Sequence, residues 1–183
     1  GRCSACGGWN TLVEEVVSRE APAVLASGAA AQPIGDVDPH MSRPQPSGID
    51  ELDRVLGGGI VPGSVTLLGG EPGVGKSTLL LQLLAQWPGK ALYVTAEESA
   101  QQVRLRAERL GAVRPDLWLL AETSLPHVIS AIGDLTPTLV VIDSIQTVHD
   151  PAIGSPPGSV TQVRDCAHQL VTVAKQRNIP VVL

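Results

Sequence analysis

A glycine-rich segment between two apolar runs constrains the fold of this chain more than any other feature. Residues 70–77 match the pattern G-x-x-x-x-G-K-[ST]. Glycines let such a loop turn its N–H groups toward a phosphate, the lysine neutralises phosphate oxygens, and a hydroxyl at a helix start ligates Mg²⁺. The pattern therefore predicts a nucleotide and magnesium site, which we expect to consist of Gly70, Glu71, Pro72, Gly73, Val74, Gly75, Lys76, Ser77 and Thr78.

The sequence around this loop predicts an α/β fold. Apolar runs without polar alternation, typical of strands buried on both faces, occur at 65–68, 91–95, 117–120, 139–142 and 181–183. Helical periodicity occurs at 49–56 with Ser47 as N-cap, 79–87, 100–110 with a capping box of Ser99 and Gln102, 126–135 and 160–177. Strands that alternate with helices predict a doubly wound parallel sheet.

Acidic residues follow two of these strands. Asp143 ends the strand at 139–142, where a carboxylate can hold Mg²⁺ through water opposite Ser77. Glu97 and Glu98 follow the strand at 91–95, at the edge where a parallel sheet binds its ligands. We expect Glu97, rather than Glu98, to orient or deprotonate the attacking water. The alternatives are a simple turn at Asp143 and two glutamates that only begin a helix. The predicted catalytic residues are thus Lys76, Glu97 and Asp143.

Composition limits the classes of partner. The chain has 183 residues, 43% of them hydrophobic, which suffices for one core and a tail. An aromatic content of 2% argues against a site that stacks bases on several rings, and a net charge of -5 restricts nucleic-acid contacts to a local surface. No apolar run is long enough to span a membrane, so we expect a cytoplasmic protein without a membrane partner.

Two further segments precede the predicted core. Residues 21–47 are rich in Ala, Pro, Gly and Ser and are predicted to form a flexible linker. Residues 1–20 contain Cys3 and Cys6 at the spacing of a zinc knuckle, with a redox pair as the competing interpretation. Cys166 lies at helical spacing with Leu170 and is expected to be a buried apolar residue. Because the chain begins without Met and ends in an apolar run, we interpret it as part of a longer protein.

Several motifs together resemble the bacterial RadA (Sms) family of RecA-like DNA-repair ATPases. They are GIDELDRVLGGG at 48–59, PGS at 62–64, the loop at 70–77, YVTAEES at 93–99, IDSIQT at 142–147 and GSVTQVR at 158–164. The resemblance covers most of the chain, the linker excepted. It implies a RecA-like P-loop NTPase core over 48–183, incomplete at its C-terminal end, in which the last strand lies between the phosphate-loop strand and the Asp143 strand. It also makes Glu97 the catalytic glutamate.

The same resemblance implies cofactors, partners and an activity. Cys3 and Cys6 correspond to half of a four-cysteine zinc ribbon, so Zn²⁺ is expected in the complete protein, besides ATP and Mg²⁺ at the core. Family members form homo-oligomeric rings and act in recombinational repair on single-stranded or branched DNA, where ATP hydrolysis drives unwinding or branch migration, and a recombinase filament is an expected partner. The alternatives are a nucleotide-switched DNA-binding adaptor without motor activity and another RecA-like ATPase of the clock-protein type.

The family also suggests where DNA binds. Residues 149–158 are rich in Pro and Gly, and loops at this place line the central channel of RecA-like rings. The segment contains no Lys or Arg, and the first basic residue after it, Arg164, is the preferred DNA contact. The alternative is a loop that only connects two elements. Arg104, Arg106 and Arg109 are expected to form a solvated face or a subunit contact rather than a DNA site.

Overall fold

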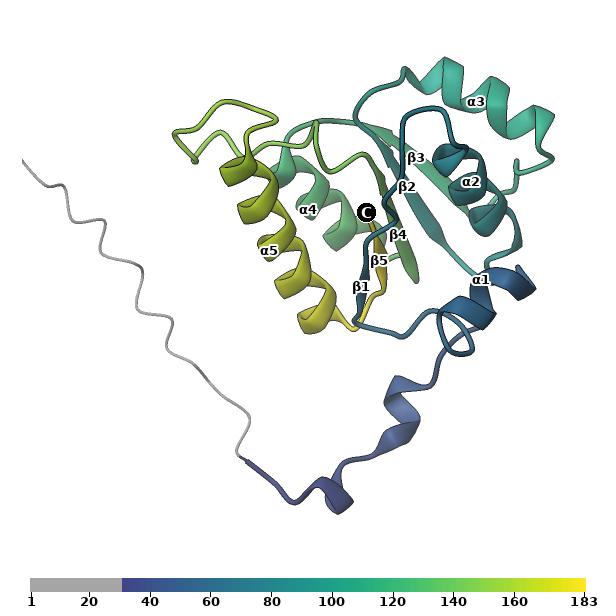
Figure 1. The fold of residues 1–183 in the computed structure, drawn as a ribbon, viewed down its shortest axis with the longest axis vertical. Helices are drawn as coiled ribbons and strands as arrows, with labels where there is room; N and C mark the ends of the chain where they lie inside the picture. The colour runs from purple at the N-terminus through teal and green to yellow at the C-terminus, as the bar shows by residue number, and fades with distance from the viewer. Residues whose placement is uncertain (1–30) are drawn as a thin grey trace, which may run out of the picture. The chain divides into compact units, whose positions relative to one another are not determined.

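Five parallel strands form one sheet in the computed structural model, which describes residues 31–183 (Figure 1). The strands are β1 (Val65–Thr66), β2 (Ala91–Thr95), β3 (Leu117–Ala121), β4 (Leu139–Asp143) and β5 (Val181–Val182). Their order across the sheet is β1-β5-β4-β2-β3. The last strand therefore lies between the phosphate-loop strand and the Asp143 strand, as the resemblance implied. The predicted α/β fold with a parallel sheet is confirmed.

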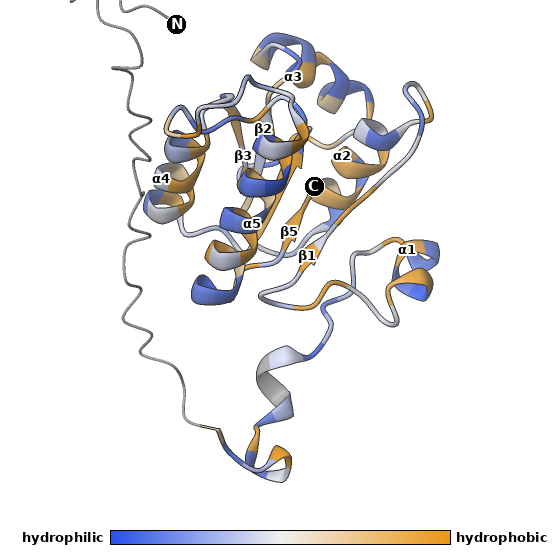
Figure 2. Ribbon diagram, turned by 60° about the vertical axis from the view of Figure 1, so that its left-hand side comes forward, coloured by the Kyte–Doolittle hydropathy of each residue, from blue (hydrophilic) through white to orange (hydrophobic). Residues whose placement is uncertain are grey.

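Helices cover both faces of this sheet. The α-helices are α1 (Asp50–Val55), α2 (Lys76–Gln86), α3 (Ala100–Arg109), α4 (Leu125–Leu135) and α5 (Val160–Arg177), and two 3-10 helices, η1 (Ile34–Asp36) and η2 (Pro39–Ser42), precede them. Figure 1 shows α2 and α3 on one face and α4 and α5 on the other. Figure 2 shows apolar strands at the centre and polar residues on the outer surfaces of α3 and α5. The chain divides after Val37 into two units, and the sheet with its helices belongs to the second, Asp38–Leu183.

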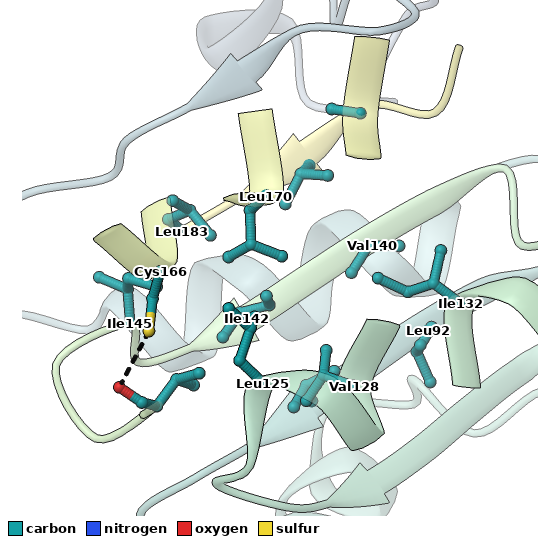
Figure 3. Close-up of a cluster of buried hydrophobic side chains, with 14 of the residues drawn as sticks. Leu92, Leu125, Val128, Ile132, Val140, Ile142, Ile145, Cys166, Leu170 and Leu183 are labelled. Carbon is teal, nitrogen blue, oxygen red and sulfur yellow. Dashed lines mark hydrogen bonds between the residues drawn. The ribbon is translucent and has the colours of Figure 1, made fainter. Parts of the chain in front are cut away.

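The face covered by α4 and α5 carries an aliphatic core (Figure 3). Val128 and Ile132 of α4 and Leu170 of α5 pack on β4, and each is fully buried. Burial of one such side chain contributes roughly 1.5–3 kcal/mol. Cys166 is 0% exposed and its Sγ lies 3.8 Å from the carbonyl oxygen of Val148, which confirms the expected buried cysteine.

The opposite face is built around α2. Its buried leucines pack on β2 and β4 together with Trp87 and Tyr93. α2 begins at Lys76, whereas the sequence predicted a start at Leu79. The apolar periodicity begins only at Leu79, but the polar residues before it already have helical geometry because Gly75, with φ of 104°, turns the loop into the helix. The difference places Lys76 and Ser77 in the first helical turn.

The segment before β1 folds differently from the prediction. α1 begins at Asp50 with Ile49 as its N-cap, so Ser47 does not cap it. The Ser47 hydroxyl instead accepts the N–H of Ile49 at 3.1 Å, and the Ser47 N–H donates to Oδ1 of Asp53 at 2.8 Å. Ser47 therefore forms a turn two residues before the observed N-cap, Ile49.

The glycine run at 57–59 ends where two backbones meet. Gln45 and Ile60 exchange backbone hydrogen bonds of 2.9 and 2.8 Å. A Cβ on Gly59, whose φ is 133°, would lie 2.2 Å from the carbonyl oxygen of Gln45, so a side chain does not fit there.

The boundaries predicted for the ribbon, linker and core segments stay predictions, and Cys3 and Cys6 lie outside the described residues.

Candidate functional site

The phosphate loop connects β1 to α2 at the carboxyl edge of the sheet. Gly73 and Gly75 have φ of 81° and 104°, and a Cβ on either would meet nothing within 4 Å. These glycines are therefore required for the turn and not for a close contact within the loop. Lys76 Nζ donates to the carbonyl oxygens of Gly70 at 2.7 Å and Glu71 at 3.0 Å. The lysine is thus held over the loop that it follows.

The start of α2 fits a phosphate and a magnesium ion. Its N-cap, Gly75, offers no side chain to the free N–H groups of the first turn, where the helix dipole favours an anion. Within residues 31–183 the hydroxyls of Ser77 and Thr78 form no hydrogen bond. Uncapped N–H groups, an ammonium group and a free hydroxyl are the donor set that a nucleotide with Mg²⁺ needs. The nucleotide assignment to residues 70–78 remains a prediction that this arrangement supports.

Asp143 ends β4 and is held by a tyrosine that sequence reasoning missed. Tyr93 Oη donates to Oδ2 of Asp143 at 2.7 Å. Burial, and then the nearby carboxylate of Asp143, raise the pKa of the Tyr93 phenol, so it keeps its proton and stays a donor. The one signal in the sequence was that Tyr93 is its sole tyrosine, within an otherwise aliphatic strand.

The turn after β2 separates the two candidate glutamates. The buried hydroxyl of Thr95 accepts the N–H of Glu98 at 3.2 Å and donates to its carbonyl oxygen at 2.9 Å. The side chain of Glu98 then points to α3, where Oε1 accepts a 2.7 Å hydrogen bond from Nη2 of Arg106. Glu97 has a different partner, since its Oε1 accepts the Ser144 hydroxyl at 2.6 Å. Only Glu97 thus reaches the end of β4.

Glu97, Asp143 and the phosphate loop therefore occupy one edge of the sheet. The loop follows β1, Glu97 follows β2 and Asp143 ends β4, and these strands are parallel. Thr95 pairs with Asp143 in the register of β2 and β4, which sets the two acidic residues beside each other. Ser144, which connects them, was also missed because nothing in its local sequence indicates a partner in another strand.

The loop expected to face DNA is fixed by a buried glutamine. Gln162 on α5 is 1% exposed. Its Nε2 donates to the carbonyl oxygens of Asp150, Ile153 and Ser155 at 3.1, 3.3 and 2.9 Å. Its Oε1 accepts the N–H of Asp150 at 3.0 Å. One side chain thus holds residues 150–155, a role that the sequence did not indicate.

The same loop contains a second polar anchor. Asp150 accepts hydrogen bonds from Nε2 of Gln169 at 2.8 Å and from the N–H of Ala152 at 2.9 Å. These two bonds, that of Gln169 first, hold the pKa of Asp150 below its ordinary value. Arg164 lies on α5 beyond this loop, with a side chain 76% exposed and Nε 3.4 Å from Oδ1 of Asp165. It is accessible, and its role in DNA binding remains a prediction.

Two of the three arginines of α3 form ion pairs within the chain. Arg104 pairs with Glu108 at 2.8 Å on the exposed face, and Arg106 pairs with Glu98 at 2.7 Å. In the part of the chain that the structure describes, no group of three or more His, Cys, Asp or Glu is arranged to hold a metal ion. None of the helices between residues 31 and 183 is long and apolar enough to cross a bilayer.

The sheet order and the residues at its carboxyl edge define a RecA-like ATPase domain, and the family profile described as "ATPase: KaiC" matches residues 45–117. Along almost its whole length the chain is similar to the DNA repair protein RadA. The RadA of Bacillus subtilis is 44% identical over 192 residues (99% of this chain, 42% of that protein), and that of Halalkalibacterium halodurans is 45% identical over 190 residues (99% and 42%). The RadA of Mycobacterium tuberculosis H37Rv is 47% identical over 194 residues (100% and 40%).

These matches confirm the resemblance to the RadA family that the motifs indicated. They also set its extent, because the chain spans about two fifths of the length of the curated relatives it matches. The activity, substrates and partners of a whole RadA protein therefore pass to this chain only as proposals.

Proposed function

We propose that this chain is the nucleotide-binding part of a DNA-dependent ATPase of RadA type that acts in recombinational DNA repair. The observation that carries the proposal is the gathering of the phosphate loop, Glu97 and Asp143 at one sheet edge. The sequence similarity also supports the proposal, because the chain is 44–47% identical to proteins described as DNA repair protein RadA.

Each group at the sheet edge has a role in ATP hydrolysis. The N–H groups of residues 70–78 bind the phosphates, and Lys76 neutralises their charge. Ser77 and, through water, Asp143 hold Mg²⁺, which when bound neutralises phosphate oxygens. Glu97 orients or deprotonates the attacking water, and Ser144 holds one of its oxygens in place. Glu98 is engaged by Arg106 and is less suited to this role.

DNA binding is assigned to the loop after β4. Residues 149–158 and Arg164 face single-stranded or branched DNA in this proposal, with Gln162 holding the loop in shape. The loop has no Lys or Arg, so backbone groups and Arg164 make the contacts. In the complete protein we infer a homo-oligomeric ring in the cytoplasm, a zinc site that uses Cys3 and Cys6, and action beside a recombinase filament, where ATP hydrolysis drives unwinding or branch migration.

The test is Glu97→Gln in the full-length protein, with ATP hydrolysis and unwinding of branched DNA measured together. We expect both rates to fall by at least about 100-fold, because a general base contributes roughly 10²–10⁴-fold, while ATP affinity is retained. Lys76→Ala serves as the companion variant and is expected to abolish nucleotide binding. Unwinding at the wild-type rate by Glu97→Gln refutes the role of Glu97. DNA binding that follows nucleotide state without unwinding supports a nucleotide-switched adaptor instead.

A further inference from the structure

We propose that Tyr93 is a positioning residue for the carboxylate of Asp143: its phenol holds Oδ2 and leaves Oδ1 to face the magnesium shell. This inference rests on the proposed role of Asp143 in holding Mg²⁺. It adds to that role a residue to which the sequence alone assigns no function, although it opens the motif YVTAEES at 93–99.

The register of the sheet makes the contact possible. Tyr93 pairs with Val141 and Thr95 pairs with Asp143 in the parallel ladder of β2 and β4. On the neighbouring strand, Tyr93 therefore lies two residues before the position that pairs with Asp143. Its side chain is on the same face of the sheet as that of Asp143. From there the ring extends along the strand direction, and Oη reaches Oδ2 of Asp143 at 2.7 Å.

Within the described part of the chain, the Asp143 carboxylate has no second side-chain hydrogen-bond partner that could fix it. Among residues 31–183 the only hydrogen bond to the Asp143 side chain comes from Tyr93. A carboxylate at a strand end rotates freely about its terminal torsion unless a partner holds it. The phenol thus decides which of the two oxygens faces away from the core.

The ring of Tyr93 is itself immobilised. Tyr93 is 2% exposed and belongs to the buried cluster that includes Leu81 and Leu84 of α2. The first turn of this helix carries Ser77, the other residue expected to hold the ion. The same buried cluster therefore supports both residues expected to hold Mg²⁺, Asp143 through Tyr93 and Ser77 through α2. Outer-shell residues support the ligands of metal sites in this way.

The experiment is Tyr93→Phe in the full-length protein, which removes one hydroxyl and keeps the ring. Binding of Mn²⁺ in the presence of ADP is followed by electron paramagnetic resonance, and ADP binding in EDTA is measured separately. We expect the apparent Kd of Mn²⁺ to rise at least about threefold, because loss of an outer-shell partner weakens metal binding. The ADP affinity in EDTA is expected to stay within a factor of two, roughly the scatter of such measurements.

Trp87→Phe is the matched control for stability. Trp87 belongs to the same buried cluster, and its Nε1 donates to Oγ1 of Thr138, away from the site. This variant also loses a buried hydrogen bond, so its melting temperature is expected to fall while Mn²⁺ binding stays unchanged. If Trp87→Phe weakens Mn²⁺ binding as much as Tyr93→Phe does, the effect is one of general stability and the inference is overturned.

Asp143→Asn separates this inference from the proposed function. If Asp143→Asn leaves Mn²⁺ binding and hydrolysis unchanged, the proposed magnesium role of Asp143 itself fails. If Asp143→Asn weakens metal binding and Tyr93→Phe does not, only the positioning role is refuted. In the double variant we expect no loss beyond that of Asp143→Asn alone, since both changes remove one interaction. A Tyr93→Phe protein that does not fold also overturns the inference, because the hydroxyl is then a purely structural group.

Discussion

The Ser144 hydroxyl donates a 2.6 Å hydrogen bond to Oε1 of Glu97, across 47 residues of sequence. This bond joins the residue that follows Asp143 to the glutamate that follows β2, so the ends of two neighbouring strands share one polar contact. Glu97 is exposed, and among residues 31–183 its side chain forms no other hydrogen bond. The hydroxyl is therefore what keeps the glutamate near the end of β4.

Removing this hydroxyl is expected to slow ATP hydrolysis without changing nucleotide affinity. A hydrogen bond to a charged group contributes roughly 1.5–3 kcal/mol, and about 1.4 kcal/mol corresponds to a tenfold change in rate. We expect Ser144→Ala to lower kcat about tenfold with KM for ATP nearly unchanged, and Ser144→Thr to restore most of the rate. Steady-state ATPase assays on the full-length protein measure both values. A change confined to KM contradicts the positioning of Glu97 by Ser144.

Glu98 gives a direct comparison with Glu97, since both follow β2. Glu98 forms a partly buried ion pair with Arg106, and surface pairs of this kind contribute roughly 0–1 kcal/mol. We expect Glu98→Gln to lower the melting temperature slightly and kcat less than about tenfold, far less than the loss expected for Glu97→Gln. Parallel ATPase and thermal-unfolding measurements check this. If kcat falls more in Glu98→Gln than in Glu97→Gln, the assignment of the two glutamates is reversed.

Gln162 is expected to support DNA binding through the shape of the loop at 150–155. Gln162→Ala removes four hydrogen bonds to the loop and leaves buried or partly buried carbonyl groups unpaired, at roughly 1–3 kcal/mol for each group that stays unsatisfied. We expect the affinity for single-stranded DNA to fall while ATP affinity without DNA is retained. Gln169→Ala, which loses only the contact to Asp150, is the milder control. Unchanged DNA affinity in a folded Gln162→Ala protein argues that the loop only connects β4 and α5.

Asp150 predicts a dependence of stability on pH. Its pKa in the fold lies below the ordinary value, about 3.9 in an unfolded chain, because Gln169 and the N–H of Ala152 bind the ionised form. The resulting stabilisation is present above about pH 3.9 and is lost as the pH falls through the folded pKa. We expect Asp150→Asn to have a lower melting temperature than the wild type at pH 7, with the difference shrinking below about pH 4. Thermal unfolding from pH 7 to pH 3 measures it, and a difference that grows toward low pH contradicts this account.

The elements of the fold could be predicted because each leaves a local pattern. The apolar runs at 91–95 and 139–142 match β2 and β4 closely, and Ser99 with Gln102 forms the predicted capping box. Errors arose where local patterns conflict with geometry. Ser47 has the chemistry of an N-cap, but its hydroxyl forms a turn with Ile49 instead.

The supporting residues of the site could not be predicted, because their partners depend on strand register. The phosphate loop has a characteristic spacing, so the sequence alone predicts the roles of Lys76 and Ser77, and these roles stay predictions. Tyr93 and Ser144 instead act through residues 50 and 47 positions away. Gln162 was part of a family motif, but its four hydrogen bonds to three loop residues follow only from the fold of that loop.

The position of β5 has a consequence for the order of events during synthesis. Among the described strands β1 pairs with β5 alone, through Val65 with Val181 and Thr66 with Val182. While a ribosome still covers Val181 and Val182, the strand that carries the phosphate loop has no neighbour, even though β2, β3 and β4 can already pair. Such distant pairing forms late, because the long intervening loop must close first. The strand that carries the phosphate loop therefore gains its neighbour in the sheet only after β5 has left the ribosome.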